Sequence, residues 1–358
     1  MTMAKILLVT FSENADHQDT LFGMYEQLAP EYDVTLLTVK HPKVPLERSA
    51  RTWLMDCPPR PGVCAKTFDL LQLARIVRRV RRERFDAVYF ESLHVWNLPI
   101  MLAVKRHAHT YQVVHEVIPH EGDTQEKGVD FMNRVVCRLA DTVVLRNRKY
   151  QSAMSERYGI APERVKVLEL WRRYPAFSEP VCSGKILFFG RINPYKGAYA
   201  LKEIAQTCPE LHFEVIGRVD AQMRHAAEAL RSLPNVRLTD SYVSDDAMRE
   251  AFQSCDWVIL PYASASQSGV IIDAYKYARP VIAFDVGAVG EQVDDGRSGF
   301  LVPAGDTAQF AETLRAAASM PESDYRAMCG YAYRYGTEKY AASGAAARFL
   351  DLIGGDTL

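Results

Sequence analysis

The sequence predicts an α/β protein made of two doubly wound domains, each a parallel sheet with helices on both faces. Three observations predict this fold class. The chain has 358 residues, which is more than one ordinary hydrophobic core accommodates. Short apolar, β-branched runs alternate with helical patterns almost throughout, and repeated β-α-β alternation produces parallel sheets. The alternation stops at Trp171–Gly184, where two prolines, a glycine and little periodicity indicate a linker.

Before the linker, apolar runs predict strands at Lys5–Thr10, Asp33–Val39, Ala87–Glu91, Gln112–Val117, Thr142–Leu145 and Val165–Leu168. After it, similar runs predict strands at Lys185–Phe189, His212–Ile216, Val236–Leu238, Trp257–Pro261 and Pro280–Phe284. The tail from Pro321 has apolar i, i+3, i+4 spacing on both sides of Gly336, which we interpret as the division between two helices. We therefore expect a Rossmann-like domain at 1–172 completed by a C-terminal helix at about 337–358, a linker at 173–184 and a second Rossmann-like domain at 185–336.

Composition and charge exclude several classes of protein. The net charge of −1 is not that of a nucleic-acid-binding polycation, so we expect no nucleic-acid partner. The seven cysteines are scattered without a CxxC pair, which favours reduced thiols over disulfides or a structural zinc site. The apolar N-terminus reads as a first strand, and no run reaches the roughly 18 to 20 apolar residues that span a bilayer. We expect a cytoplasmic protein.

The second domain begins with a turn suited to phosphate. The strand ends at Phe189, and Gly190, Arg191, Lys196 and Gly197 follow before the next helix. Glycine allows close approach to the backbone, and a helix N-terminus points free N–H groups at an anion. Arginine binds phosphate through two parallel hydrogen bonds, and lysine adds a point charge. A solvated loop with two ordinary surface cations is the alternative.

A second turn of this kind follows the strand that begins at Trp257. Its residues Ser264–Gly269 are small and polar, and the helix that follows carries Asp273 in its first turns. A carboxylate there can accept two hydrogen bonds from a ribose diol, or merely complement the helix dipole. Two such turns in one domain fit a nucleoside diphosphate, although the sequence contains neither the dinucleotide nor the P-loop glycine fingerprint.

These segments resemble a known family. The run "FFGRINPYKG" looks like the G-R-x-x-x-x-K-G segment of retaining glycosyltransferases of family 4. The run "PYASASQSGVIIDAYKYARPVIAFDVGAVGEQVDDGRSGFLVPAGD" looks like the donor-site block of that family. The match covers most of Lys185–Asp306, whereas the N-terminal half matches loosely. The resemblance implies the GT-B fold, in which two Rossmann-like domains face each other across a deep cleft and the last helix, here Thr337–Ile353, returns to the first domain.

The resemblance also implies a donor site. Arg191 and Lys196 would hold the diphosphate, Ser268 and Gly269 would present backbone N–H groups, and Asp273 would hold the ribose. Tyr242 falls in the base-flanking loop of the family and would pack on the base; a half-buried aromatic at the sheet edge is the alternative. The expected donor-binding residues are Gly190, Tyr242, Ser266, Gln267, Ser268, Gly269, Val270 and Asp273.

The sequence departs from the family pattern at one position. Two acids separated by seven residues are typical of the family, but Ala265 stands in the first place and the second acid is Asp273. The first acid would lie near the hydroxyls of the donor sugar, so Ser266 or Gln267 would substitute for it. This departure leaves room for a weak or inactive enzyme, and keeps a nucleotide-sugar epimerase and a non-catalytic sugar-nucleotide binder as alternatives.

In the first domain, "YQVVHEVIPHEGD" resembles the strand-end His-acid element of the family. His115 would then act beside the transferred sugar as a catalytic residue, together with Arg191 and Lys196. We expect acceptor contacts from Asn14, His17, Asp19, Glu116 and His120. A core or metal-binding histidine is the alternative, but the spacing of His115 and His120 matches no zinc signature, and we predict no metal site.

The run Phe68–Phe85 is strongly basic. It carries six arginines against two acids, with an apolar stripe at Leu70, Leu71, Ile76, Val77 and Val80. Such a helix suits an anionic lipid surface, and a helix that covers the sheet with a solvated outer face explains the stripe equally well.

Together these features predict a retaining, metal-independent glycosyltransferase without a cofactor. Its donor would be a nucleoside diphosphate sugar of the UDP or GDP type, and its acceptor a glycan or lipid-linked saccharide. We expect it in the cytoplasm, in peripheral contact with the inner membrane face.

Overall fold

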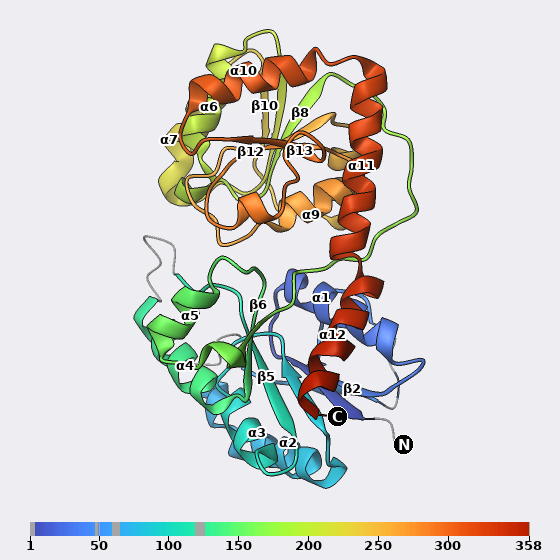
Figure 1. Ribbon diagram of the computed structural model, residues 1–358. Coiled ribbons are helices and arrows are strands. Elements are labelled where there is room, and N and C mark those ends of the chain that lie inside the picture. Colours follow the sequence, from blue (N-terminus) through green and yellow to red (C-terminus); the bar gives the residue numbers. More distant parts are fainter. Residues whose placement is uncertain (1–3, 47–48, 50, 59–64, 119–125, 358) are drawn as a thin grey trace. The chain divides into compact units, whose positions relative to one another are not determined.

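The computed structural model describes residues 4–46, 49, 51–58, 65–118 and 126–357. The chain divides into two compact units (Figure 1). The N-terminal unit comprises Met1–Arg173 and Ala341–Leu358, and the C-terminal unit comprises Tyr174–Tyr340. Each unit is built around one parallel sheet, so the α/β fold class expected from the sequence is confirmed. The cleft between the units stays a prediction.

The N-terminal unit has a seven-stranded sheet in the order β3-β2-β1-β4-β5-β6-β7. Its strands are β1 Lys5–Thr10, β2 Asp33–Val39, β3 Thr52–Met55, β4 Ala87–Phe90, β5 His109–Val114, β6 Thr142–Leu145 and β7 Val165–Val167. Its helices are α1 Ala15–Leu28, α2 Leu70–Glu83, α3 Asn97–Val104, α4 Glu126–Leu139, α5 Gln151–Tyr158 and α12 Ala342–Thr357, with 3₁₀ turns at η1 Ala65–Phe68 and η2 Pro162–Arg164.

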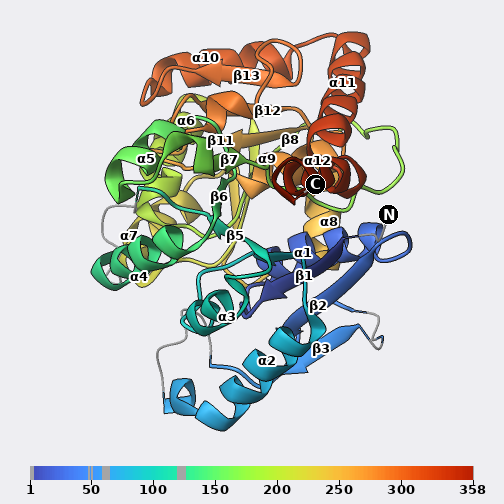
Figure 2. The same ribbon diagram turned by 60° about the horizontal axis from the view of Figure 1, so that its bottom comes forward.

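Both faces of this sheet are buried, which explains the continuous apolar runs of its strands. In β1, Ile6 and Leu8 point into the core beneath α1 and α12, whereas Leu7 and Val9 point into the core beneath α2 and α3. Figure 2 shows these two pairs of helices on opposite faces of the sheet. The C-terminal helix α12 contributes Phe349 to the first core, and its ring meets Tyr89 edge-on at 5.0 Å.

The C-terminal unit has a six-stranded sheet in the order β10-β9-β8-β11-β12-β13. Its strands are β8 Lys185–Phe189, β9 His212–Ile216, β10 Val236–Thr239, β11 Trp257–Leu260, β12 Val281–Phe284 and β13 Gly299–Val302. Its helices are α6 Ala198–Thr207, α7 Arg224–Arg231, α8 Asp245–Gln253, α9 Gly269–Lys276, α10 Thr307–Ala318 and α11 Glu322–Tyr340, with 3₁₀ turns at η3 Pro194–Lys196, η4 Ala221–Met223 and η5 Val289–Glu291.

Some element predictions need correction. The strands β3 and β13 have no counterpart in the prediction, and both are four-residue strands at the edges of their sheets. The strand β5 begins at His109 and ends at Val114, three residues earlier at each end than predicted. The polar residue Thr110 near the start of this strand has a hydrogen-bond partner, because its hydroxyl donates to the Asp141 carboxylate at 2.7 Å.

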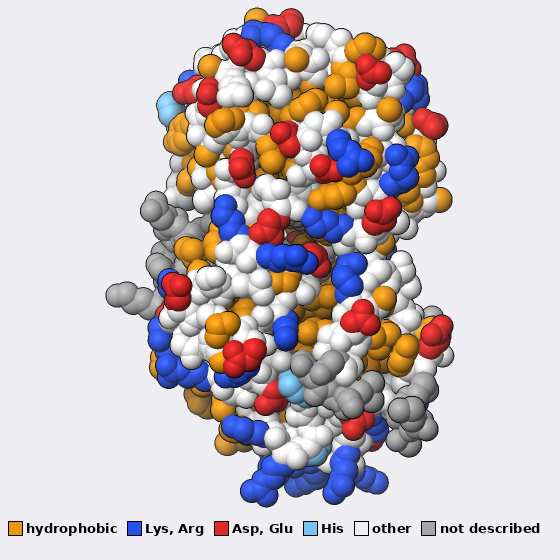
Figure 3. Space-filling view, in the orientation of Figure 1, with side chains coloured by type: hydrophobic (Ala, Val, Ile, Leu, Met, Phe, Trp, Pro, Cys, Tyr) orange, Lys and Arg blue, Asp and Glu red, His pale blue; other side chains and the backbone are white. Residues whose placement is uncertain are grey.

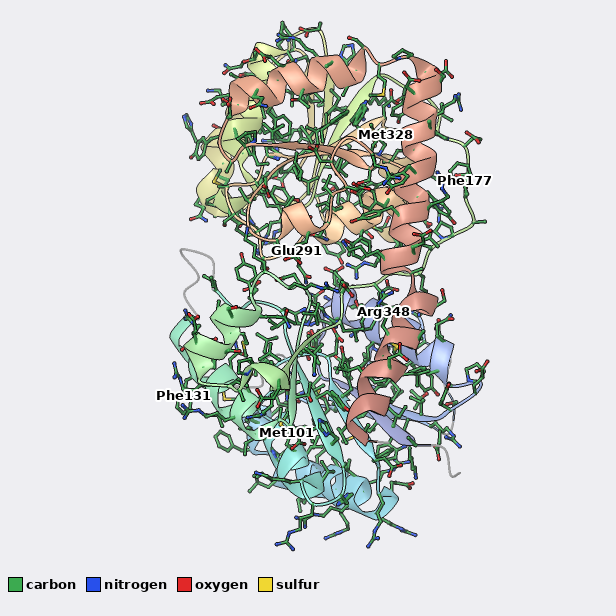
Figure 4. All side chains as sticks on the ribbon, in the orientation of Figure 1. Met101, Phe131, Phe177, Glu291, Met328 and Arg348 are labelled. Carbon is green, nitrogen blue, oxygen red and sulfur yellow. The ribbon has the colours of Figure 1, made fainter. Side chains whose placement is uncertain are left out.

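The prediction that Gly336 divides two helices is wrong, because α11 runs through it to Tyr340. Gly336 is needed for close packing instead. A Cβ atom there would lie 2.6 Å from the Cβ atom of Tyr275 on α9 and 2.7 Å from the hydroxyl of Tyr174. The segment 174–184 runs along α11, as the labels of Phe177 and Met328 in Figure 4 show. The helical path breaks at Ala341, which pairs with Arg172.

Candidate functional site

Each sheet has one switch point, where the strand order reverses. It lies between β1 and β4 in the N-terminal unit and between β8 and β11 in the C-terminal unit. Ligands of such sheets bind beyond the carboxyl ends of the strands at the switch point. The loops that follow β8 and β11 contain most of the residues expected to bind the donor.

The loop after β8 brings Lys196 over Gly190. Gly190 has a φ of 109°, and a Cβ atom there would lie 2.5 Å from Nζ of Lys196 and 3.9 Å from Cγ2 of Val270 on α9. The ammonium group therefore occupies space that any side chain at Gly190 would fill, beside the first turn of α9. Asn193 fixes the loop, because its side-chain oxygen accepts a hydrogen bond from the Lys196 N–H at 3.0 Å.

The loops after β8 and β11 touch at Gly197. Its φ is 74°, and a Cβ atom there would lie only 1.7 Å from the carbonyl oxygen of Pro261. The N–H of Ala263 also donates to the carbonyl of Tyr195 at 2.8 Å. These contacts hold the two turns that the sequence marks as anion-binding in one fixed arrangement.

We expect Gly197→Ala to destabilise the C-terminal unit by at least about 2 kcal/mol, since the left-handed backbone and the steric clash both disfavour a side chain. Thermal unfolding measures the loss. Gly296→Ala is the matched control, because Gly296 also has a φ of 74° but nothing within 4 Å of its Cβ position. The control should cost only about 1 kcal/mol. Equal losses in the two variants would contradict the packing of Gly197 on Pro261.

The structure corrects the role expected of the Ser268 N–H. This group donates to Oε1 of Gln292 at 2.7 Å, and Nε2 of Gln292 donates back to the Ser268 carbonyl at 3.0 Å. Both residues are buried. The Ser268 side chain makes no capping hydrogen bond to α9. Gln292 is a residue that sequence reasoning missed, and it fixes the start of α9, where Gly269 and Val270 form the first turn.

The other expected donor residues differ in exposure. Asp273 is buried in the first turns of α9, and Ala265 is buried in the loop before it, with its carbonyl accepting the Ala288 N–H at 3.3 Å. Ser266 and Gln267 are half-buried. Tyr242 is 80% exposed, so the half-buried alternative for this ring is wrong. The side chain of Arg191 is 58% exposed, and its Nε lies 3.9 Å from Oδ2 of Asp220.

In the N-terminal unit, the structure brings His115 and His17 together. Their rings stack with centroids 4.3 Å apart and planes 16° from parallel. His17 follows β1 and has its Nδ1 3.0 Å from the hydroxyl oxygen of Ser12. His115 follows β5 and has its Nε2 2.7 Å from the carbonyl oxygen of Glu91. Both histidines thus lie at the carboxyl end of the sheet, near its switch point.

The remaining residues expected on the acceptor side have other contacts. Asn14 is the N-cap of α1 and accepts the Asp16 N–H at 2.9 Å. Asp19 pairs with Arg173 at 3.5 Å. Glu116 is exposed, and His120 lies outside the described residues.

Sequence reasoning missed the buried ion pair of Glu91 and Arg146. Both side chains are fully buried, and Nη2 of Arg146 donates to Oε1 of Glu91. Nη1 of Arg146 donates to the Leu168 carbonyl at 3.0 Å, and the guanidinium lies 4.6 Å from the ring centroid of Trp171. Burial alone would raise the pKa of Glu91, but Arg146 and His115 outweigh it and lower that pKa. A charged residue that ends one predicted strand, Ala87–Glu91, and another directly after the predicted strand Thr142–Leu145 are the signal that could have indicated this pair.

The basic run at 68–85 forms the helix α2. The apolar stripe belongs in part to the core, because Ile76 and Val80 are buried beneath the helix, whereas Leu70 and Leu71 are exposed. All six arginines are exposed. Figure 3 shows Lys and Arg side chains gathered over α2, at the lower end of the N-terminal unit.

Metal-binding clusters and membrane-spanning helices are both absent from the described part of the chain. Within it, no group of three or more His, Cys, Asp or Glu side chains is arranged to hold a metal ion. None of the helices described there is both long enough and apolar enough to cross a membrane.

The chain is similar to known glycosyltransferases over most of its length. The family model described as "Glycosyl transferases group 1" matches residues 183–319, and the "Glycosyl transferase 4-like domain" matches residues 20–171. A D-inositol 3-phosphate glycosyltransferase of Streptomyces bingchenggensis is 25% identical over 281 residues, which cover 70% of this chain and 61% of that relative. A GDP-mannose:glycolipid 4-beta-D-mannosyltransferase of Xanthomonas campestris is 31% identical over 120 residues, covering 32% of this chain and 34% of that relative.

Solved structures share the fold at low sequence identity. The Anabaena protein HepE, crystallised with UDP and glucose, aligns with a TM-score of 0.72 and 15% identity over 98% of this chain and 99% of that one. A glycosyltransferase of Rickettsia africae aligns with a TM-score of 0.72 and 13% identity, over 99% of each chain. With two matching family models and a sheet of the expected topology in each unit, the chain belongs to the group 1, family 4-like glycosyltransferases of the GT-B fold.

Proposed function

We propose that this protein is a glycosyltransferase that moves a sugar from a nucleoside diphosphate sugar to an acceptor with retention of configuration. The observation that carries the proposal is the position of Lys196. Its ammonium group lies over Gly190, whose Cβ position is 3.9 Å from Val270 in the first turn of α9, at the switch point of the second sheet. A cation beside a glycine backbone and a helix N-terminus favours a phosphate ligand.

In this proposal, Lys196 and Arg191 hold the donor diphosphate, and the first N–H groups of α9, from Gly269 on, complete its cradle. Asp273 binds the ribose, and Tyr242 packs on the base. Ser266 and Gln267 contact the donor sugar in place of the acid that Ala265 lacks. His115 of the N-terminal unit contacts the substrate, with Glu116, His17 and His120 on the acceptor side.

The proposed chemistry is largely electrostatic. The bond between the anomeric carbon and the phosphate oxygen breaks, and its electron pair leaves with the diphosphate. The acceptor oxygen forms the new bond on the same face of the sugar, and its proton passes to the departing phosphate oxygen. Charge therefore builds on the diphosphate, where the preorganised Lys196, Arg191 and the N-terminus of α9 stabilise it. These groups supply the positive charge without a bound metal ion.

The relatives narrow the class of substrate. HepE was crystallised with UDP and glucose, and the Xanthomonas relative is named for GDP-mannose and a glycolipid. We propose a UDP or GDP sugar as donor and a glycan or lipid-linked saccharide as acceptor.

Thermal unfolding with a panel of UDP, GDP and ADP sugars tests this function. A ligand present at about 100 times its dissociation constant stabilises its protein by about 2.7 kcal/mol, so we expect one donor to raise the unfolding midpoint by about 5–10 °C. Turnover with that donor should then yield a glycosylated acceptor. Binding of no nucleotide sugar, or an epimerised donor released without transfer, would contradict the proposal.

We also propose that α2 holds the protein against an anionic membrane surface. Its five arginines and Arg84 directly after it are exposed, and Leu70 and Leu71 extend an apolar edge at its N-terminus. Each cation near such a surface contributes about 1 kcal/mol. Four Arg→Gln changes should therefore weaken co-sedimentation with anionic vesicles at least about tenfold. The replaced residues are Arg78, Arg79, Arg81 and Arg82.

A matched control variant has the same change in net charge, but its substitutions lie in the C-terminal unit. Its four Arg→Gln changes fall on exposed arginines, namely Arg231, Arg237, Arg249 and Arg297. This control should bind vesicles as the wild type does. Equal binding by the α2 variant and the wild type would show that α2 does not hold the protein against the membrane surface.

A further inference from the structure

Three charged or polar side chains stand directly after three neighbouring strands of the N-terminal sheet. Glu91 follows β4, His115 follows β5 and Arg146 follows β6, and these strands are adjacent in the sheet. The carboxyl ends of parallel strands meet at one edge, so the three residues converge near the switch point of this sheet. The role proposed above for His115 leaves the other two residues without a function.

The surroundings of His115 determine which of its ring nitrogens carries hydrogen. Its Nε2 lies 2.7 Å from the carbonyl oxygen of Glu91 and 3.4 Å from the carboxylate oxygen Oε1 of the same residue. Both atoms are acceptors, so Nε2 must be the donor. In the neutral ring, Nδ1 is then the acceptor nitrogen. The stacked ring of His17 fixes the plane of the imidazole.

The carboxylate behind His115 is itself held in place. Glu91 and Arg146 are both fully buried, and Oε1 of Glu91 accepts from Nη2 of Arg146. Arg146 is anchored by the Leu168 carbonyl and the Trp171 ring. A buried ion pair of this kind adds little net stability compared with apolar side chains of the same size. The position of this ion pair beside His115 is therefore better explained by its effect on the His115 ring.

We propose that Glu91, held by Arg146, is a positioning residue that orients and polarises His115. The carboxylate and carbonyl of Glu91 keep the hydrogen on Nε2, and the negative charge strengthens Nδ1 as an acceptor for a hydroxyl group of the sugar substrate. This inference rests on the proposed function, in which His115 contacts that substrate. No proton has to leave the ring for this role, because a hydrogen bond to Nδ1 is sufficient.

A double-mutant cycle tests the proposal in the full chain. We expect Glu91→Gln to lower kcat about 10- to 100-fold, which is the worth of one hydrogen bond to a charged group, with little change in KM for the donor. In a His115→Ala background, the same change should lower kcat less than about twofold, because the residue through which Glu91 acts is gone. Equal losses in both backgrounds would overturn the proposal.

Asp130→Asn is the matched control for loss of a carboxylate. Asp130 pairs with Arg157 in the contact between α4 and α5, at 2.9 Å. This variant should keep the kcat of the wild type. Should Glu91→Gln fail to fold, Glu91→Asp keeps the charge opposite Arg146 but withdraws it from His115, and we expect it to fold with a lowered kcat. A Glu91→Asp variant that folds and keeps the wild-type kcat would overturn the proposal.

Nitrogen-15 NMR of the histidine side chains gives a readout that needs no turnover. With the His115→Gln variant for assignment, the wild type should show His115 with hydrogen on Nε2, and Glu91→Gln should shift this resonance while leaving the other histidines unchanged. Hydrogen on Nδ1 in the wild type would overturn the proposal. A protein that binds no nucleotide sugar would instead contradict the proposed function, and the NMR result would still decide whether Glu91 positions His115.

Discussion

Replacing Lys196 with alanine should lower turnover about 10²- to 10³-fold, equivalent to about 2.7–4 kcal/mol of transition-state stabilisation. The ammonium group lies over Gly190 at the start of α9, where we place the departing diphosphate. Negative charge on that group grows as the glycosidic bond to phosphate breaks, so a cation held there stabilises the transition state more than the bound donor. The loss should therefore fall on kcat more than on KM. Arg191→Ala should act in the same direction.

Steady-state kinetics and calorimetric titration with the nucleoside diphosphate measure this effect. Lys185→Ala is the control, because Lys185 is also half-buried but lies at the opposite, amino end of the same strand β8. The control should retain wild-type kinetics. Near-normal turnover of both Lys196→Ala and Arg191→Ala with the true donor would show that the assignment of the phosphate site is wrong.

Replacing Arg146 with leucine should destabilise the N-terminal unit by about 3–5 kcal/mol, because it leaves the fully buried carboxylate of Glu91 without its partner. Urea unfolding followed by a probe in this unit measures the loss. Arg157→Leu removes a partly exposed ion pair with Asp130 and is the control, with an expected loss of no more than about 1 kcal/mol. A loss of that small size in Arg146→Leu would contradict the buried pair.

The same pair predicts how stability depends on pH. Burial acts to raise the pKa of Glu91, but the neighbouring Arg146 and His115 lower it below its ordinary value. A carboxyl group whose pKa is lowered in the folded state stabilises the fold above its unfolded pKa, which is about 4.3 for glutamate. This contribution is lost as the pH falls through the folded pKa. In Arg146→Leu, burial raises the folded pKa of Glu91, so acid neutralises the unpaired carboxylate and the difference in unfolding free energy between the variant and the wild type should narrow as the pH falls.

Much of the fold could be predicted from the sequence. The bounds predicted for β1, β2, β6, β8 and β9 are those of the structure, because buried parallel strands are short apolar runs between clear turn residues. The edge strands β3 and β13 could not be predicted, since their pairing partners rather than their own four residues make them strands. Gly336 was misinterpreted because a glycine in a helix has the same local signal whether it ends the helix or admits a neighbouring ring.

By itself, the sequence determined the doubly wound fold class and the two turns in which Gly190, Lys196 and Gly269 lie, because periodicity, glycine placement and charge are local properties of the chain. The tertiary structure alone decided the partners of those residues. Gln292 lies 24 residues after Ser268 in the chain, and only in the folded structure does its side chain accept the hydrogen bond of the Ser268 N–H. Only there do Glu91, His115 and Arg146 meet, since they follow three separate strands that the sheet places side by side. Hydrogen bonds and ion pairs depend on distances in space, and sequence separation does not encode those distances.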